Sequence, residues 1–175
     1  MVKVSKEQMG KDEKKILAEL QQNAQESIDQ LAKRCGFSRQ KVWRIVKRLE
    51  KTRFIWGYSA IIDEKKNDVN HYTLLLKRTT KKLDEKTVDI ITSRKLEDIV
   101  SGIGATIENS YYVNGEYDWI VTFTASNIVQ AKKFCEALLS LHNDIIEKTI
   151  LLETLFFIKD HYILNPESKK LREFL

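Results

Sequence analysis

The stretch that decides the N-terminal fold is residues 27–51, which read SIDQLAKRCGFSRQKVWRIVKRLEK. Ser27, with Gln30 three residues later, has the form of a capping box, so a helix is expected to begin there. It should end at Gly36, because glycine tolerates the left-handed conformation that a helix end needs. Ser38 is placed to cap a second helix that runs to the end of the stretch. Two short helices joined by this tight turn predict a helix-turn-helix.

The spacing of small and apolar residues supports this prediction. Ala32 is small where the first helix must approach the second closely, and Val42 and Ile45, six and nine residues beyond the turn glycine, face back into the core. A preceding helix over residues 12–22, capped by Asp12, would complete a three-helix unit. An ordinary helical hairpin with a glycine turn is the alternative that the spacing alone leaves open.

The last helix of the stretch divides into an apolar and a cationic face. At about 100° per residue, Val42, Ile45, Val46 and Leu49 share one side. A recognition helix needs this division, because its outer side chains reach base edges and phosphates in the major groove. The residues that we predict to contact DNA are Ser38, Arg39, Gln40, Lys41, Trp43, Arg44, Lys47, Arg48 and Lys51.

These candidates have different expected roles. Gln40 and Arg44 lie toward the N-terminal half of the helix, where Gln can pair with adenine and Arg with guanine. Lys47, Arg48 and Lys51 are better placed for phosphates. For any single lysine, the alternative is an ordinary solvated helix face. Trp43 has two open interpretations, since it could pack against the scaffold or lie over sugar and base.

The charge distribution agrees with a polyanionic partner for the first third only. Residues 1–60 carry 14 Lys and Arg against 7 Asp and Glu, a net of +7, whereas residues 61–175 carry 16 against 18, a net of −2, which together give the formal +5. A membrane surface would also attract a basic segment. No stretch approaches the roughly 20 apolar residues of a membrane-spanning helix, and no secretory signal is evident, so a cytoplasmic location is expected.

The rest of the chain changes to an α/β pattern. We expect strands at 54–62, 71–79, 106–113, 119–125 and 148–159, and helices at 84–100 and from Ser126 to about 142. From residue 71 the order is β-α-β-β-α-β, the ferredoxin-like arrangement, so the predicted fold class is α+β with a winged-helix-like N-terminal domain. The expected domains are 1–62, the helix-turn-helix with its following strand; 63–70, a linker; 71–160, the ferredoxin-like domain; and 161–175, a tail.

Several of these residues together resemble the Lrp/AsnC (feast/famine) transcription regulators. The resemblance rests on Leu31-Ala32-Lys33-Arg34, Gly36-Phe37-Ser38, Val46-Lys47-Arg48-Leu49-Glu50, Ile55-Trp56-Gly57-Tyr58-Ser59-Ala60 and Gly115-Glu116-Tyr117-Asp118, and it covers about residues 11–159. The chain departs from the family pattern twice. Ile45 stands where an arginine is usual, and Arg53 stands where a glycine usually ends the recognition helix.

The resemblance implies a second domain that dimerises through its sheet, often builds tetramers or octamers from dimers, and binds an amino acid or related small metabolite. Gly115, Tyr117 and Asp118 are the effector-binding candidates, because accessible backbone N–H groups suit a carboxylate and Asp118 suits an ammonium group. A plain hairpin turn at Asn114-Gly115 is the alternative. Both faces of the last strand are largely apolar, which also favours a partner subunit.

The sequence leaves two alternatives to a DNA-binding regulator. The histidines show no metal-ligand spacing and the cysteines, Cys35 and Cys135, resemble small core residues, so no catalytic residue, cofactor or metal site is expected. Some proteins of this build are decarboxylases that act on haem precursors, which keeps an enzyme as one alternative. An effector-sensing adaptor without DNA binding is the other.

Overall fold

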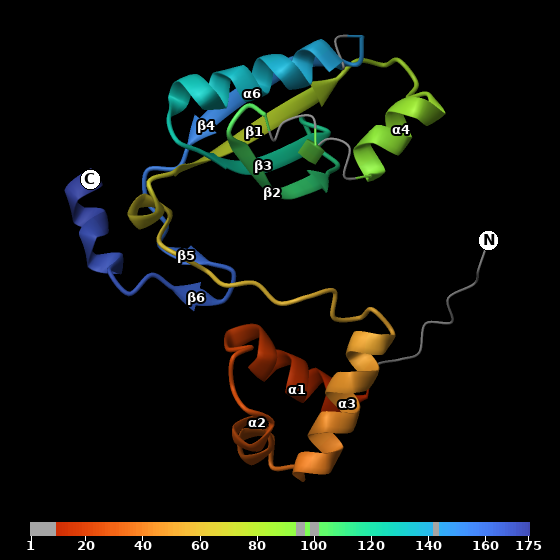
Figure 1. Cartoon of the computed structure of the whole chain (residues 1–175), viewed down its shortest axis with the longest axis vertical. Coiled ribbons are helices and arrows are strands. Elements are labelled where there is room, and N and C mark those ends of the chain that lie inside the picture. Colours follow the sequence, from red (N-terminus) through yellow and green to blue (C-terminus); the bar gives the residue numbers. More distant parts are fainter. Residues whose placement is uncertain (1–9, 94–96, 99–101, 142–143) are drawn as a thin grey trace. The chain divides into compact units, whose positions relative to one another are not determined.

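A computed structural model describes residues 10–93, 97–98, 102–141 and 144–175. By contacts the chain divides into two compact units. One holds the residues up to Ile61 together with Ile158–Arg172, and the other holds Ile62–Phe157 with Glu173–Leu175. Figure 1 shows the elements of both units. None of the described helices combines the length and apolar character required to cross a membrane.

The N-terminal unit contains the predicted helix-turn-helix. Its helices are α1 (Lys11–Gln22), α2 (Ile28–Cys35) and α3 (Arg39–Lys51). The apolar stripes of the three helices meet in one core, and the predicted inward positions of α3 are all buried there. The core consists of Ile16, Leu31, Ala32, Cys35, Val42, Ile45, Val46 and Leu49.

Helices α2 and α3 begin where the sequence predicted, and each is capped by the predicted serine side chain. The Ser27 hydroxyl accepts from the Gln30 N–H at 3.2 Å, and the Gln30 side chain accepts from the Ser27 N–H at 3.0 Å, which confirms the capping box. Ser38 caps α3 by accepting from the Lys41 N–H. The predicted Asp12 cap is wrong, because α1 begins earlier and the Gly10 N–H donates to the Glu13 carboxylate at 2.8 Å.

Helix α3 ends at a left-handed residue that is not glycine. Arg53 has φ 56°, its N–H donates to the Glu50 carbonyl, and the Phe54 N–H donates to the Leu49 carbonyl. This is the Schellman pattern that also closes α2 at Gly36, where φ is 67°. Arg53 therefore takes the conformation that a glycine would adopt without strain from a Cβ.

The strand predicted at 54–62 is not formed. Those residues have no regular secondary structure, and the aromatic side chains of Phe54, Trp56 and Tyr58 are exposed. An extended segment becomes a strand only when its backbone N–H and C=O groups find a neighbouring strand. The described part of this chain supplies no such neighbour for residues 54–62. The side-chain pattern therefore indicated an extended segment without indicating its partner.

The second unit confirms the predicted ferredoxin-like order. Its elements are the 3-10 helix η1 (Glu64–Asn67), β1 (Asn70–Arg78), α4 (Glu85–Thr92), β2 (Ala105–Tyr112), β3 (Trp119–Ala125), α6 (Ile128–Leu141) and β4 (Ile146–Glu153). The four strands are antiparallel in the order β2-β3-β1-β4, so β1 is hydrogen-bonded on both sides.

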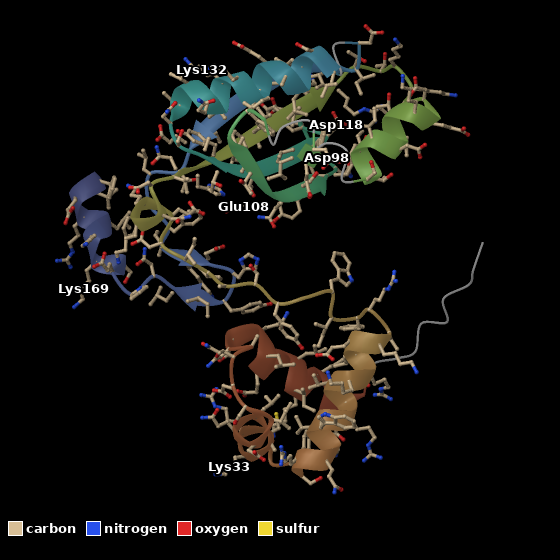
Figure 2. The ribbon with its side chains drawn as sticks, viewed as in Figure 1. Lys33, Asp98, Glu108, Asp118, Lys132 and Lys169 are labelled. Atoms are coloured by element: carbon tan, nitrogen blue, oxygen red, sulfur yellow. The ribbon has the colours of Figure 1, made fainter. Side chains whose placement is uncertain are left out.

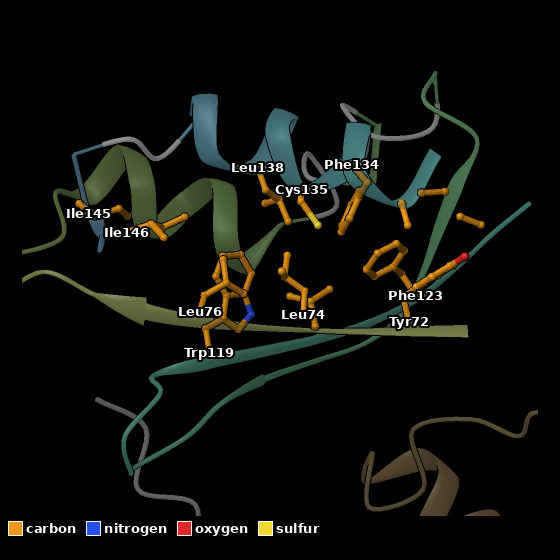
Figure 3. Packing of buried hydrophobic residues seen from close by; sticks show 14 residues of the cluster. Tyr72, Leu74, Leu76, Trp119, Phe123, Phe134, Cys135, Leu138, Ile145 and Ile146 are labelled. Carbon is orange, nitrogen blue, oxygen red and sulfur yellow. The ribbon is translucent and has the colours of Figure 1, made fainter. Parts of the chain in front are cut away.

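Helices cover one face of this sheet, and the core lies between the helices and the sheet (Figure 3). Tyr72, Leu74 and Leu76 of β1 point into it, and Phe123 packs on Phe134 of α6 with ring centroids 4.2 Å apart. Cys135 is part of this core, and burial raises the pKa of its thiol to about 11. Both cysteines are buried and reduced, as expected for small core residues.

Several predicted boundaries in this unit are wrong. The helix expected over 84–100 is interrupted, because α4 ends at Thr92 and Ser93 is extended. Val88, expected to face inward, is exposed, and the predicted inward positions 96 and 99 lie outside the described residues. The cap of α6 is Asn127 rather than Ser126, since the Asn127 side chain accepts from two N–H groups of the first turn.

The last predicted strand is shorter than expected, and part of the linker is folded. Strand β4 covers only Ile146–Glu153, and the linker contains η1. Beyond β4 the chain forms a small hairpin of β5 (Lys159–Asp160) and β6 (Ile163–Leu164), followed by the 3-10 helix η2 (Ser168–Phe174). Within the second unit, the Phe174 ring packs on Phe156 with centroids 5.5 Å apart.

The left-handed residue at the end of α3 leads to a stability prediction. Replacing Arg53 by Gly should raise the free energy of unfolding by about 1 kcal/mol, because it removes the clash of a Cβ at positive φ. Arg53→Ala, which removes the charge and keeps the Cβ, should give little or none of this gain. Urea unfolding followed by helical circular dichroism measures both. Equal stabilisation by Gly and Ala would assign the effect to charge instead of backbone conformation.

Candidate DNA-binding surface

The buried inner face of α3 determines which of its side chains project outward. Val42, Ile45, Val46 and Leu49 anchor the helix in the three-helix core, so the residues between them project outward. Ile45 is only 9% exposed. Ile45, one of the two departures from the family pattern noted in the sequence, therefore serves the core in this chain.

The N-terminal end of α3 carries a shallow, open concavity lined by Ser38, Arg39, Gln40, Trp43 and Arg44. Trp43 is 56% exposed, so it does not pack into the scaffold, and of its two interpretations only an outward-facing one agrees with the structure. No hydrogen bond or ion pair joins Gln40 or Arg44 to another residue in the described part of the chain. Both side chains therefore keep their hydrogen-bonding groups available for an incoming ligand.

Three of the predicted contact residues on α3 are held by acidic side chains of other helices. Arg39 pairs with Asp29 at 3.3 Å and Lys41 with Asp12 at 2.7 Å. Arg48 pairs with Glu13, and the Lys41 ammonium also lies 4.1 Å from the ring centroid of Phe37. These acidic residues come from α1 and α2, and they position the basic side chains along the edge of α3. The Arg39–Asp29 and Lys41–Asp12 pairs are exposed, and such pairs are weak, typically below about 1 kcal/mol, so phosphates can replace these carboxylates.

The C-terminal part of α3 has a further acidic partner that sequence reasoning missed. The Lys47 ammonium lies 2.7 Å from the Glu50 carboxylate, and the Tyr58 hydroxyl donates to the same carboxylate at 3.2 Å. The hydrogen bond from Lys47, followed by that from Tyr58, holds the pKa of Glu50 below its usual value. The three-residue spacing of Lys47 and Glu50 could have revealed the ion pair, but only the fold brings in Tyr58. Lys51 is exposed on the last turn of α3.

The three effector candidates lie on or beside the loop between β2 and β3, and Asp118 is marked in Figure 2. Asp118 has a structural role: its carboxylate accepts from the Arg78 N–H at 2.8 Å, and its own N–H donates to the Leu76 carbonyl at 3.0 Å. Tyr117 lies under the Lys148 ammonium, 5.9 Å from the ring centroid. Gly115 is exposed and its φ is not positive, so it does not adopt the left-handed conformation of a type I′ Asn-Gly turn, and the connection is not such a turn. It is a longer loop over residues 113–118.

Among families of known proteins, a match is found for the N-terminal part of the chain. Residues 13–55 match the family described as winged helix-turn-helix DNA-binding. No curated protein sequence matches the chain.

Solved structures match across nearly the whole length. An AsnC family transcriptional regulator from Agrobacterium tumefaciens superposes with a TM-score of 0.65 at 19% identity, over 91% of this chain and 98% of that one. The leucine response regulatory protein of Mycobacterium tuberculosis gives 0.64 at 20% identity, over 89% and 100%. A transcriptional regulator from Neisseria meningitidis, solved in complex with L-methionine, gives 0.62 at 17% identity, over 95% and 99%.

The match over α1 to α3 and the likeness that extends through the βαββαβ unit agree with the resemblance noted from the sequence. This chain therefore has the fold of the Lrp/AsnC transcription regulators, with a helix-turn-helix of the winged DNA-binding class at residues 13–55.

Proposed function

We propose that this chain is a sequence-specific DNA-binding transcription regulator whose recognition helix is α3. The observation that carries the proposal is the outward-facing group of Gln40, Trp43 and Arg44, which lines an open concavity at the N-terminal end of α3. Base-reading residues of helix-turn-helix proteins lie in this part of the recognition helix. Here Arg44 would donate both guanidinium hydrogen bonds to a guanine edge, and Gln40 would pair with an adenine.

The remaining basic residues suit the DNA backbone. Arg39, Lys41, Lys47 and Arg48 lie around α3 in ion pairs, and Lys51 extends the cationic edge toward its C-terminus. Phosphates that displace the acidic partners would release counterions and fix the register of the helix in the groove, without reading sequence. The Ser38 hydroxyl is already the cap of α3, so its expected contribution is to hold the helix end in place.

A single recognition helix reads few base pairs, so a homodimer is part of the proposal. The sheet face opposite the helices supports it. Leu75, Ile120 and Ile150 lie on this face, together with Leu152, which is 49% exposed. An apolar sheet face of this kind is expected to pack on a second copy. The extended residues 54–62, with Trp56 95% exposed, offer a further strand for a partner. Assembly of dimers into tetramers or octamers follows the family pattern.

An amino-acid effector is the third part of the proposal. The Neisseria meningitidis relative was solved with L-methionine, which makes an amino acid the first ligand class to consider for this chain. Gly115, Tyr117 and Asp118 stay the candidate residues. Because the Asp118 Oδ2 already accepts from the Arg78 N–H, only its second carboxylate oxygen would be available to a ligand ammonium group.

The DNA-contact roles lead to contrasting mutant effects. Arg44→Ala should weaken binding to a specific site by about 1–3 kcal/mol and relax the preference at one base position. Lys51→Ala should weaken all sequences alike and lower the slope of log affinity against log salt concentration by about 1. The site is first selected from random DNA, and affinities are then measured by fluorescence anisotropy at several salt concentrations.

Lys132→Ala is the matched control for these variants, because Lys132 is an exposed lysine on α6 (Figure 2). It should leave DNA affinity unchanged. If the wild-type protein showed no salt-dependent affinity for any DNA, the regulator proposal would fail and an adaptor would be favoured.

The dimer proposal predicts a change of mass. Leu152→Lys places a charge on the uncovered sheet face and should convert the protein to a particle near the monomer mass of 20.5 kDa. Val129→Lys on α6 alters an equally exposed apolar residue on the other side of the sheet and should leave the dimer intact. Light scattering at micromolar concentration distinguishes these outcomes. A wild-type monomer would rule the dimer out.

The effector proposal is tested by a thermal-shift screen of the amino acids. A ligand that raises the melting temperature of the wild type should lose most of this effect in Asp118→Asn, which keeps an oxygen to accept from the Arg78 N–H and removes the charge. Glu116→Gln, an exposed carboxylate in the same loop, should respond as the wild type does. A ligand effect that survives Asp118→Asn would place the pocket elsewhere.

A further inference from the structure

The fold brings one histidine and two glutamates together at one end of the sheet. Glu64 lies in η1, His71 near the start of β1, and Glu108 in β2, which is marked in Figure 2. One ligand atom from each of these side chains lies within 4.8 Å of the other two. From this geometry we propose that Glu64, His71 and Glu108 bind a divalent transition-metal ion of the Zn²⁺ class. Spacing along the chain did not reveal this group, because His71 and Glu108 are 37 positions apart.

The histidine is held in the orientation that a metal ligand needs. His71 is 8% exposed, and its Nδ1 lies 2.7 Å from the Thr154 hydroxyl oxygen, which can accept a hydrogen bond from it. The edge of the ring packs against Phe157, with centroids 4.9 Å apart. In the tautomer with the proton on Nδ1, which donates to Thr154, the lone pair is on Nε2, the atom that faces Glu108. Metal-binding histidines are oriented by such a second hydrogen bond.

An irregularity in the sheet aims Glu108 at the histidine. The register between β2 and β3 shifts between Ile107 and Asn109, so Glu108 is the bulged residue without a partner in the ladder. A bulge redirects the side chain that it carries. His71 pairs with Thr124 of β3, and Glu108 reaches toward it from the other side of β3. The long carboxylate arm thereby spans one strand.

The separation of the two ligand atoms suits a shared metal ion. His71 Nε2 and a Glu108 carboxylate oxygen are 3.3 Å apart. Two ligands, each about 2.0–2.1 Å from Zn²⁺ in tetrahedral geometry, lie about 3.3–3.4 Å apart. Glu64 would complete three protein ligands after a small side-chain movement, and water would occupy the fourth position. The Glu108 side chain is 35% exposed and leaves a path from solvent.

The donor set determines the class of ion. Two carboxylates beside a neutral imidazole carry a net charge of −2, which favours a divalent cation. One nitrogen and two oxygen donors suit Zn²⁺, Co²⁺ and Ni²⁺, whereas Ca²⁺ and Mg²⁺ prefer oxygen alone and Cu(I) prefers sulfur. The ion would tie η1 to the sheet at the place where Lys65 already anchors it, by donating to the Leu155 carbonyl at 3.0 Å.

The test is a titration of tag-free, chelator-treated full-length protein with Zn²⁺ in a calorimeter. One Zn²⁺ per chain is expected, together with a raised melting temperature in thermal shift. His71→Gln and Glu108→Gln should each weaken the affinity at least tenfold. Because His71 is buried and its substitution can perturb folding, the exposed Glu108 provides the second, independent variant. Circular dichroism verifies that both are folded.

His161→Gln is the matched control, since His161 is an exposed histidine that also lies beside a carboxylate, that of Asp160. It should bind Zn²⁺ as the wild type does. Co²⁺ gives a spectroscopic check, because its visible bands should indicate low coordination and disappear in Glu108→Gln. Absence of stoichiometric Zn²⁺ binding, or equal affinity in Glu108→Gln and the wild type, would overturn the proposal and leave His71 and Glu108 as an ion pair.

Discussion

The α/β unit depends on β1, which, like β3, is hydrogen-bonded to a neighbouring strand on each side. Its antiparallel registers with β3 and β4 place Leu74 opposite Val121 and Leu151, so all three residues face the helices. Because side chains alternate along a strand, the same registers send Leu75 and His71 to the other face. A slip of one residue would exchange the two faces. The covered core, the uncovered apolar face and the orientation of His71 therefore follow from one set of backbone hydrogen bonds.

In the N-terminal unit the comparable constraint is the way that the helices end. The capping box at Ser27, the cap at Ser38 and the left-handed residues Gly36 and Arg53 determine where each helix stops, and thus where the outer face of α3 begins. Arg53 shows that the hydrogen-bond pattern can be kept without glycine, at a cost in backbone strain. In this chain, the arginine at position 53 adds a positive charge beyond the last turn of α3.

The basic surface around α3 is less positive than the count of basic residues suggests. Acidic side chains accompany Arg39, Lys41, Lys47 and Arg48, whereas Gln40 and Arg44 have no such partners among the described residues. At each paired basic side chain, a DNA phosphate would replace the carboxylate, so one anion takes the place of another. This exchange affects the affinity and its salt dependence more than the sequence specificity. The groups that we propose to read bases are those that the fold leaves without competing acidic partners.

The sequence by itself determined the helix-turn-helix and the βαββαβ order, because both depend on local signals: the capping box at Ser27, the turn at Gly36, the helical period of Val42 to Leu49, and the alternation along β1. It failed where a feature depends on a distant partner. Residues 54–62 have the composition of a strand but no neighbour to pair with, and the helix predicted over 84–100 is interrupted at Ser93. Only the tertiary structure decided that Asp118 holds the end of β1, that Tyr58 bonds to Glu50, and that Glu64, His71 and Glu108 meet. These contacts join residues that lie on different elements, and their positions depend on strand register, a bulge and helix packing, which the order of amino acids reveals only after the chain has folded.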